Sequence, residues 1–206
     1  MTALLALEAG GGGDATVISG RAAKATGTRL GLAAGMRVRR ADLVAAALIA
    51  SANDACLALA EATAGNEAAF VARMNRRAGE MGLAHTHFVN ACGHDAPGHL
   101  SSARDLAALG EAALQNAALA ELVGRRDGSF STADGRVFRF ATTNALLGRV
   151  PGVRGVKTGY TRAAGHCLIA VAERDGVRVL VVMLGARDRW WDAAAMIENA
   201  FRSAPR

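Results

Sequence analysis

The segment Val156-Lys157-Thr158-Gly159-Tyr160-Thr161 places a cation, a hydroxyl and a glycine side by side on a predicted strand. The ammonium of Lys157 can bind a carboxylate, and the hydroxyl of Thr158 can hydrogen-bond to the same group. Gly159 has no side chain, so an extended peptide can approach the strand and pair with its backbone. The alternative is an exposed Lys-Thr-Gly turn. The segment therefore predicts a strand that binds a peptide ending in a carboxylate.

Two more strand-like segments, 166–173 and 177–184, follow the first, which spans 153–159. The last two are joined through Arg174-Asp175-Gly176, which is a hairpin signal. A helix over about residues 188–201 then places four apolar residues on one face: Trp190, Ala194, Ile197 and Phe201. The last third of the chain therefore predicts an antiparallel sheet covered by a helix.

Helical patterns precede this sheet. Residues 1–9 are typical of the end of a helix that Gly10 to Gly13 break, and 14–40 are typical of loops and short strands. From Asp42, apolar residues follow the 3.6-residue period: Leu43, Ala46, Ala47 and Ile49. A second helix is predicted from Asp54 to about Ala64.

Two further helices complete this half. One carries an apolar face and ends at Gly82; the face consists of Phe70, Met74, Ala78 and Met81. The other starts at the capping box Ser102-x-x-Asp105 and bears Leu106, Leu109 and Ala113. Helices first, then strands, then a helix predict an α+β fold with a helical lobe and a sheet lobe, in one domain over residues 1–206.

Ser51-Ala52-Asn53 interrupts the helical pattern between the helices that start at Asp42 and Asp54. Ser and Asn are weak inside helices but good caps, so a helix cap is one interpretation. The other is that a hydroxyl and an amide at this junction relay a proton and hold a substrate carbonyl. Taken alone, Ser51-Ala52-Asn53 leaves both interpretations open.

Composition narrows the class of protein. Hydrophobic residues make up 51% and charged residues 20% of the 206, which excludes a disordered chain. The net charge of +6 comes from scattered arginines, and only nine residues are aromatic (2 Trp, 1 Tyr, 6 Phe), so nucleic-acid binding is not expected. No apolar run reaches the length of about 18 residues that a membrane span needs. No basic region precedes the apolar start, so no signal peptide is predicted.

The cysteines and histidines predict neither a disulfide framework nor a metal site. Cys56, Cys92 and Cys167 show no paired pattern, and Cys56 and Cys167 lie in apolar runs typical of small core residues. The spacing of the histidines and cysteines between His85 and His99 matches no common zinc pattern. We therefore expect no metal and no cofactor.

Together these segments resemble the D-alanyl-D-alanine carboxypeptidases, the low-molecular-mass penicillin-binding proteins with the β-lactamase/transpeptidase-like fold. The resemblance rests on six segments: 1–4, Ser51-Ala52-Asn53-Asp54-Ala55, Phe88-Val89-Asn90, Ser102-Ala103-Arg104-Asp105, 156–161, and Leu184-Gly185-Ala186. The family uses three motifs, S-x-x-K, S-x-N and K-T-G. The second and third are present here.

The resemblance implies a role for each motif residue. Ser51 and Asn53 would assist proton transfer and orient the substrate. Lys157, Thr158 and Gly159 would bind the terminal carboxylate of a peptidoglycan stem peptide ending in D-Ala-D-Ala, or that of a β-lactam. The backbone N–H of Tyr160 would form half of the oxyanion hole. It also implies a periplasmic or extracytoplasmic location.

No S-x-x-K string occurs in these 206 residues. In the family, the motif lysine lies about two residues before a segment that resembles residues 1–4, so the nucleophile and the first strands of the sheet would lie upstream of Met1. We expect an N-terminally incomplete and catalytically inactive chain, from a truncated record or a mis-assigned start. A non-catalytic module that binds peptidoglycan peptides or β-lactams is the alternative, and an unrelated α+β domain is a third. If the resemblance holds, Ser51 and Lys157 should face each other at the lobe boundary.

Overall fold

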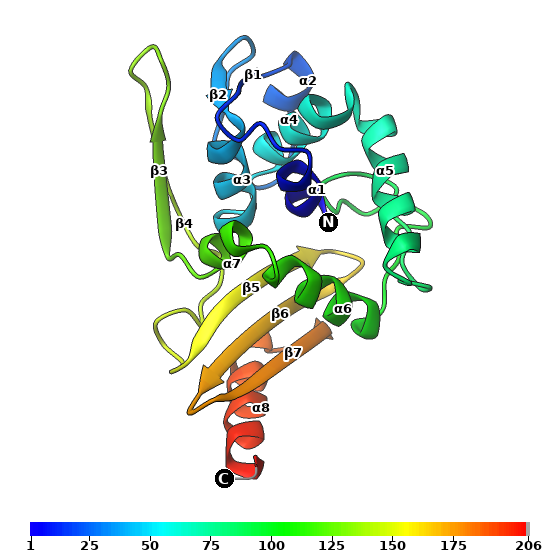
Figure 1. Ribbon diagram of the computed structural model, residues 1–206, viewed down its shortest axis with the longest axis vertical. Coiled ribbons are helices and arrows are strands. Elements are labelled where there is room, and N and C mark those ends of the chain that lie inside the picture. The colour runs from blue at the N-terminus through cyan, green and yellow to red at the C-terminus, as the bar shows by residue number, and fades with distance from the viewer. Residues whose placement is uncertain (205–206) are drawn as a thin grey trace.

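The computed structural model describes residues 1–204 and places a helical lobe against one end of a sheet (Figure 1). The helices are α1 (Thr2–Glu8), α2 (Gly20–Ala23), α3 (Arg40–Ile49), α4 (Asn53–Ala64), α5 (Glu67–Glu80), α6 (Ala103–Leu114), α7 (Ala117–Val123) and α8 (Arg189–Ser203). The strands are β1 (Ala15–Val17), β2 (Arg37–Arg39), β3 (Asp127–Ser131), β4 (Val137–Ala141), β5 (Val153–Thr161), β6 (Gly165–Arg174) and β7 (Val177–Ala186). The predicted order of helices before strands is confirmed.

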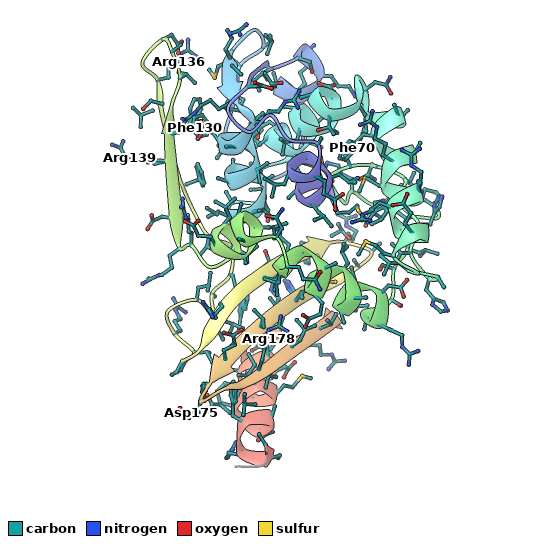
Figure 2. The ribbon with its side chains drawn as sticks, in the orientation of Figure 1. Phe70, Phe130, Arg136, Arg139, Asp175 and Arg178 are labelled. Carbon is teal, nitrogen blue, oxygen red and sulfur yellow. A yellow bond between two sulfur atoms is a disulfide. The ribbon has the colours of Figure 1, made fainter. Side chains whose placement is uncertain are left out.

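The sheet lobe has three layers and contains the predicted antiparallel sheet. Strands β5, β6 and β7 pair antiparallel in that order, and the β6–β7 turn carries Asp175 at its tip (Figure 2). Successive residues of β6 face opposite sides because side chains alternate along a strand. Ile169 and Val171 pack with the cluster that includes α6 and α7, whereas Leu168 packs against α8. The sheet is therefore covered by helices on both faces (Figure 1).

One apolar core runs from the helical lobe into the sheet. Leu43 and Leu59 are fully buried between α3 and α4, and the same cluster includes Val156 on β5. Phe70, Met74 and Ala78 are buried on one face of α5, as the periodicity predicts, and Phe70 lies inside the helical lobe (Figure 2). A core shared between the lobes fixes their relative position, which matters because the site uses residues from both.

Two elements between α6 and the sheet have no counterpart in the sequence prediction. Helix α7 is capped by Asn116, whose side chain accepts a hydrogen bond from the Leu119 N–H. The hairpin of β3 and β4 rises beside α3 and packs Phe130 against Phe138, with ring centroids 5.1 Å apart (Figure 1). Both elements are short, so each offers only a brief run of apolar positions to a sequence pattern. Boundaries elsewhere shift slightly: α3 begins at Arg40 and α4 at Asn53.

The expectation that the cysteines are unpaired is wrong. Cys56 on α4 and Cys92 in the loop after α5 form a disulfide, with their Cα atoms 5.9 Å apart although 36 residues separate them in sequence. Packing of α5 against α4 brings them together, and Phe70, Met74 and Ala91 surround them. Sequence spacing carried no sign of this contact because it depends on the tertiary fold. Of the cysteines in the described chain, only Cys167 is free, and it is partly exposed.

Candidate active site

The two lobes meet where the side chains of Ser51 and Lys157 touch. The Nζ atom of Lys157 donates a hydrogen bond to the Ser51 Oγ across a sequence separation of 106 residues. A second bond from Nζ reaches the Thr158 carbonyl at 3.0 Å. The prediction that Ser51 and Lys157 face each other at the lobe boundary is confirmed.

Ser51 occupies an unusual backbone conformation between α3 and α4. Its φ angle is 56°, in the left-handed region, directly after the helix C-cap Ala50. A non-glycine residue there costs on the order of 1 kcal/mol, so the surrounding structure must hold it in place. The Ser51 hydroxyl does not cap α4, whose N-cap is Ala52 without a side-chain bond. The helix-cap interpretation of this serine therefore fails, and its hydroxyl is directed to β5 instead.

Asn53 begins α4 and binds the loop that precedes β2. Its Nδ2 donates to the Thr26 carbonyl at 2.7 Å, and its backbone N–H donates to the Thr28 carbonyl at 2.8 Å. A Cβ at Gly27, where φ is +76°, would lie 2.8 Å from that Nδ2, so the close approach requires glycine. The Oδ1 of Asn53 accepts no hydrogen bond from residues 1–204 and remains available to a ligand.

Asp54 fixes the same loop from beneath. The side chain is fully buried, and its carboxylate accepts hydrogen bonds from the backbone N–H groups of three consecutive residues, at 3.2 Å, 2.8 Å and 3.0 Å for Leu30, Gly31 and Leu32. A buried carboxylate is tolerated only when its oxygens are paired in this way. Asp54 directly follows Ser-x-Asn, but nothing in the sequence pattern predicts this role for it. It holds the wall of the site next to Asn53.

Lys157 lies in an environment that weakens its charge. Burial and, to a smaller extent, the positive charge of Arg189 together lower the pKa of its ammonium to about 8. The same ammonium contributes to lowering the pKa of the Met1 amino group, after the larger effect of burial. The start of α1 therefore lies near Lys157. At neutral pH most Lys157 side chains are protonated, but the proton is held less firmly than in water.

Thr158 is positioned by a residue that the sequence analysis missed. Its hydroxyl lies 2.5 Å from the Thr143 hydroxyl, and the Thr143 N–H donates to the Ile49 carbonyl at 3.2 Å. Thr143 thus links the end of α3 to β5. A polar string, Thr142-Thr143-Asn144, follows strand β4, but nothing in its spacing pointed to Thr158.

Gly159 leaves space beside β5, and the pairing of β5 with β6 does not require that space. It pairs with Cys167 on β6, and a Cβ at Gly159 would meet the Cys167 Cβ at 3.5 Å, an ordinary contact. Pairing within the sheet therefore does not demand glycine. Arg189, also missed, donates to the Gly159 carbonyl at 2.6 Å and the Cys167 carbonyl at 3.2 Å. Thirty residues separate Arg189 from Gly159, and only the docking of α8 joins them.

Tyr160 turns its ring away from Lys157. The side chain is 64% exposed, and its ring centroid lies 4.6 Å from that of His166 on β6. Adjacent residues of a strand face opposite sides, so Lys157 and Gly159 share one face and Tyr160 has the other, as does Thr158. The Thr158 hydroxyl nevertheless stays at the lobe boundary, where it meets the Thr143 hydroxyl. Only the backbone of Tyr160 is therefore a candidate for contact with a ligand at Lys157.

A comparison with known families fits this arrangement. The family model described as D-alanyl-D-alanine carboxypeptidase matches residues 1–188, which include every motif residue above. The chain belongs to the D-alanyl-D-alanine carboxypeptidase family.

Curated members of the D-alanyl-D-alanine carboxypeptidase family share about a third of its residues. The D-alanyl-D-alanine carboxypeptidase DacF of Bacillus subtilis is 35% identical over 209 residues, which cover 98% of this chain and 54% of that protein. DacC of Escherichia coli is 38% identical over 154 residues, which cover 74% of this chain and 38% of that protein. The chain thus spans about half or less of the length of these carboxypeptidases.

Solved structures of this type give the same fold. The D-alanyl-D-alanine carboxypeptidase of Mycobacterium tuberculosis superposes with a TM-score of 0.91 at 29% identity, covering 100% of this chain and 80% of the other. A variant of a Streptomyces DD-transpeptidase gives a TM-score of 0.91 at 25% identity, covering 98% and 85%. The predicted α+β, transpeptidase-like fold is therefore confirmed.

Neither a metal-binding group nor a membrane-spanning helix is found in the part of the chain that the structure describes. No three His, Cys, Asp or Glu residues among residues 1–204 gather closely enough to hold a metal ion. Over the same residues, every helix is too short or too polar to cross a bilayer.

Proposed function

We propose that this chain is the substrate-binding and proton-relay part of a serine-type D-alanyl-D-alanine carboxypeptidase. Such an enzyme removes the terminal D-alanine of a peptidoglycan stem peptide through an acyl-enzyme. The observation that carries the proposal is the hydrogen bond between Lys157 and Ser51, which joins the two motifs across the lobe boundary.

The strand β5 binds the end of the peptide. The Lys157 ammonium and the Thr158 hydroxyl hold the terminal D-alanine carboxylate, or the carboxylate of a β-lactam, through charge-assisted hydrogen bonds. Gly159 lets the peptide backbone lie against the strand, and the Tyr160 N–H donates to the oxygen that becomes negative during acylation. Thr143 keeps the Thr158 hydroxyl in place at 2.5 Å.

The helix junction moves the proton. As the nucleophile attacks the carbonyl carbon, the carbon–nitrogen bond breaks and the departing D-alanine amine must gain a proton. Ser51 passes its hydroxyl proton to that amine and regains a proton from the base that took the proton of the nucleophile. The Lys157 ammonium keeps its charge for the carboxylate and orients the Ser51 hydroxyl through its hydrogen bond to Oγ. The free Oδ1 of Asn53 accepts a hydrogen bond from a substrate amide and orients the scissile bond.

The nucleophile itself lies outside these residues. The chain has two lysines, Lys24 and Lys157, and an arginine precedes each by three positions, so neither completes an S-x-x-K motif. We propose that a Ser-x-x-Lys segment outside residues 1–206 supplies the serine and its base, and that the 206 residues alone form no acyl-enzyme.

We also propose an extracytoplasmic location, at the cell wall where the substrate lies. The Cys56–Cys92 disulfide supports this proposal because disulfides persist mainly in oxidising compartments.

Labelling with a fluorescent penicillin tests the assignment. The 206-residue chain should form no covalent adduct, whereas the same chain extended upstream through an in-frame Ser-x-x-Lys should label with about one penicillin per protein. A stoichiometric adduct on the short chain would contradict the proposal and implicate Ser51 as the nucleophile. An extended chain that is folded but unlabelled would favour a non-catalytic binding module.

Single substitutions in the extended chain test the roles. Lys157→Ala should weaken acylation by about 2–3 kcal/mol because a charge-assisted contact is lost. Ser51→Ala and Asn53→Ala should lower turnover more than ground-state binding, since both act in the transition state. Arg76→Gln, an exposed change on α5, is the control. Unaltered kinetics in all three site variants would remove the assignment.

A further inference from the structure

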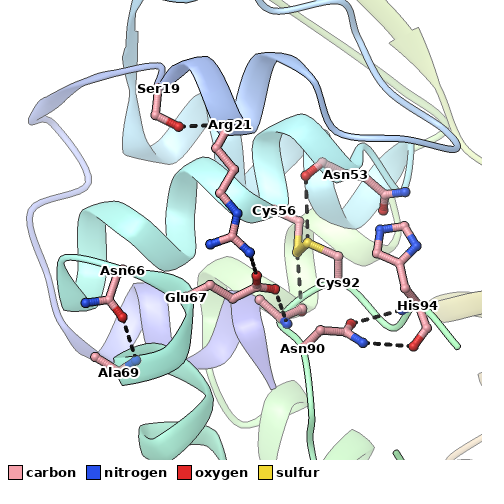
Figure 3. Close-up of polar contacts among 12 residues, drawn as sticks. Ser19, Arg21, Asn53, Cys56, Asn66, Glu67, Ala69, Asn90, Cys92 and His94 are labelled. Atoms are coloured by element: carbon pink, nitrogen blue, oxygen red, sulfur yellow. Dashed lines mark hydrogen bonds and ion pairs between the residues drawn. A yellow bond between two sulfur atoms is a disulfide. The ribbon is translucent and has the colours of Figure 1, made fainter. Parts of the chain in front are cut away.

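A pocket opens beside Asn53, apart from the residues proposed to bind the terminal carboxylate. Its volume is about 370 Å³. Neither Ser51 nor Lys157 lines it, and Asn53 is the motif residue that it shares with the proposed active site. Its walls are formed by Arg21, Lys24, Ala25, Thr26, Asn53, Leu57, Glu67, Asn90, Cys92 and His94. Figure 3 shows Arg21, Glu67, Asn90 and His94 gathered around the disulfide.

The acidic and amide groups of this pocket are already occupied. One carboxylate oxygen of Glu67 accepts from the Arg21 guanidinium and the other from the Ala91 N–H at 3.0 Å (Figure 3). The Asn90 side chain is also satisfied, because it accepts from the Gly93 and His94 N–H groups and donates to the His94 carbonyl. These groups therefore shape the pocket but have little left to offer a ligand.

The cations of the pocket are the groups that remain available. Within the described chain, the Lys24 side chain makes no hydrogen bond or ion pair. Arg21 balances Glu67, so Lys24 leaves the pocket with an uncompensated positive charge. A pocket with spare cationic donors and saturated acceptors favours a negatively charged ligand.

The course of a bound peptide brings one side chain to this pocket. In the proposed function, Lys157 and Thr158 hold the terminal carboxylate and Asn53, which also lines this pocket, orients the scissile bond. The residue before the D-alanines is then the part of the peptide nearest to the pocket. Leu57 and Cys92 can contact the methylene groups of a ligand side chain. Lys24 lines the same pocket. A long side chain ending in a carboxylate meets both requirements.

We propose that this pocket is a specificity subsite for the residue that precedes D-Ala-D-Ala in the stem peptide, and that it selects a side chain ending in a carboxylate. The carboxylate pairs with the Lys24 ammonium. This inference rests on the proposed function, because it takes the orientation of the peptide from Lys157. A side chain ending in an amine or a neutral amide lacks the charge that Lys24 complements, and it binds more weakly.

An equilibrium titration of the 206-residue chain tests this subsite without requiring catalysis. NMR titration would compare three peptides of the form X-D-Ala-D-Ala, in which X is 2,6-diaminopimelate, its side-chain amide, or lysine. The acid and the amide have nearly the same size and differ in charge. The chain should bind the acid roughly three- to tenfold more tightly than the amide, and the preference should shrink in high salt.

Three variants identify the residue that pairs with the side-chain carboxylate, and they separate the subsite from the proposed function. Lys24→Gln should bind acid and amide equally. Arg76→Gln removes the same charge from an exposed site on α5 and should keep the preference. Lys157→Met should weaken all three peptides alike because each shares the terminal carboxylate.

Two results overturn the subsite but leave the proposed function standing. In the first, the unmodified chain binds acid and amide with equal affinity, and binding still requires Lys157. In the second, the preference for the acid over the amide persists in Lys24→Gln. Affinity that does not depend on Lys157, or no affinity for any peptide, overturns the proposed function and the subsite with it. Thermal unfolding of each variant, expected near that of the unmodified chain, excludes misfolding as the cause of a loss.

Discussion

The helical lobe and the sheet hold their shares of the site in different ways. Ser51 lies in left-handed backbone, beside a loop that Asp54 fixes through buried hydrogen bonds and close to a disulfide on α4. Lys157, Thr158 and Gly159 lie on the part of β5 that pairs residue by residue with β6, from Gly155 to Thr161, after a bulge between Val153 and Gly155. The helical lobe therefore positions residues by constraining irregular backbone, whereas the sheet positions them by strand geometry.

This difference predicts that substitutions in the helical lobe change the stability of the fold, whereas substitutions on the strand change ligand affinity. Where irregular backbone is held by a few strong interactions, the loss of one should destabilise the fold. On a paired strand, side chains that face a ligand can be exchanged at little cost to the fold, and ligand affinity should change instead. Three experiments can break or sharpen the contrast.

The largest effect is expected for Asp54→Ala. The change leaves the N–H groups of Leu30, Gly31 and Leu32 without their partner. Since each hydrogen bond to a charged group is worth about 1.5–3 kcal/mol, the free energy of unfolding should fall by about 5 kcal/mol. Urea denaturation measures the loss. Asp192→Ala, which removes an exposed carboxylate on α8, should lower the free energy of unfolding by less than about 1 kcal/mol. Equal losses at both positions would contradict the special role of the buried carboxylate.

Removal of the disulfide should also lower the free energy of unfolding. Replacing Cys56 and Cys92 by serine together removes a crosslink that closes a loop with a sequence separation of 36. The chain-entropy relation gives about 4 kcal/mol for a loop of that length. Unfolding curves with and without reductant should differ for the unmodified chain and coincide for the double variant. Cys167→Ser in the sheet should keep the reductant effect, and a chain indifferent to reductant would speak against the crosslink.

The smallest stability change is expected at Lys157 and depends on pH. Its folded pKa, about 8, lies below the value of about 10.4 for an unfolded lysine. Below pH 8 the ammonium is charged in both states, and its burial destabilises the fold. Between these two pKa values the unfolded chain binds more protons, so the free energy of unfolding rises with pH, by about 2 kcal/mol.

Lys157→Met should remove this rise. Melting temperatures at several pH values between 7 and 10.5, compared between the unmodified chain and the variant, provide the measurement. The affinity of the unmodified chain for a peptide carboxylate should fall over the same range as the ammonium is lost. A parallel pH dependence in both proteins would mean that another group titrates.

Local pattern was enough to predict the elements that carry the motifs. The apolar face of α5, the hairpin at Asp175 and the Ser102 cap of α6 each depend on residues close in sequence. The meeting of Ser51 and Lys157 was predictable only through the family resemblance, since no local signal spans that separation. The fold class followed from the order of helices and strands.

The contacts that position the site escaped prediction because they join distant segments. Thr143 reaches Thr158 from the segment after β4, and Arg189 reaches Gly159 from α8. The Cys56–Cys92 pair depends on how α5 packs against α4. In each case the residue types are evident in the sequence, but the contacts between them form only when the core brings distant segments together.

The pairing of two cysteines leaves Cys167 as the single thiol of the described chain, and its place gives it a practical use. It lies opposite Gly159 on the face of the sheet that Lys157 shares, and it is partly exposed. A thiol-reactive fluorophore would therefore attach at one position, within a few ångströms of the strand along which the peptide is proposed to lie. Its emission would report occupancy of β5 directly, and a bulky label there would compete with the peptide for the same space.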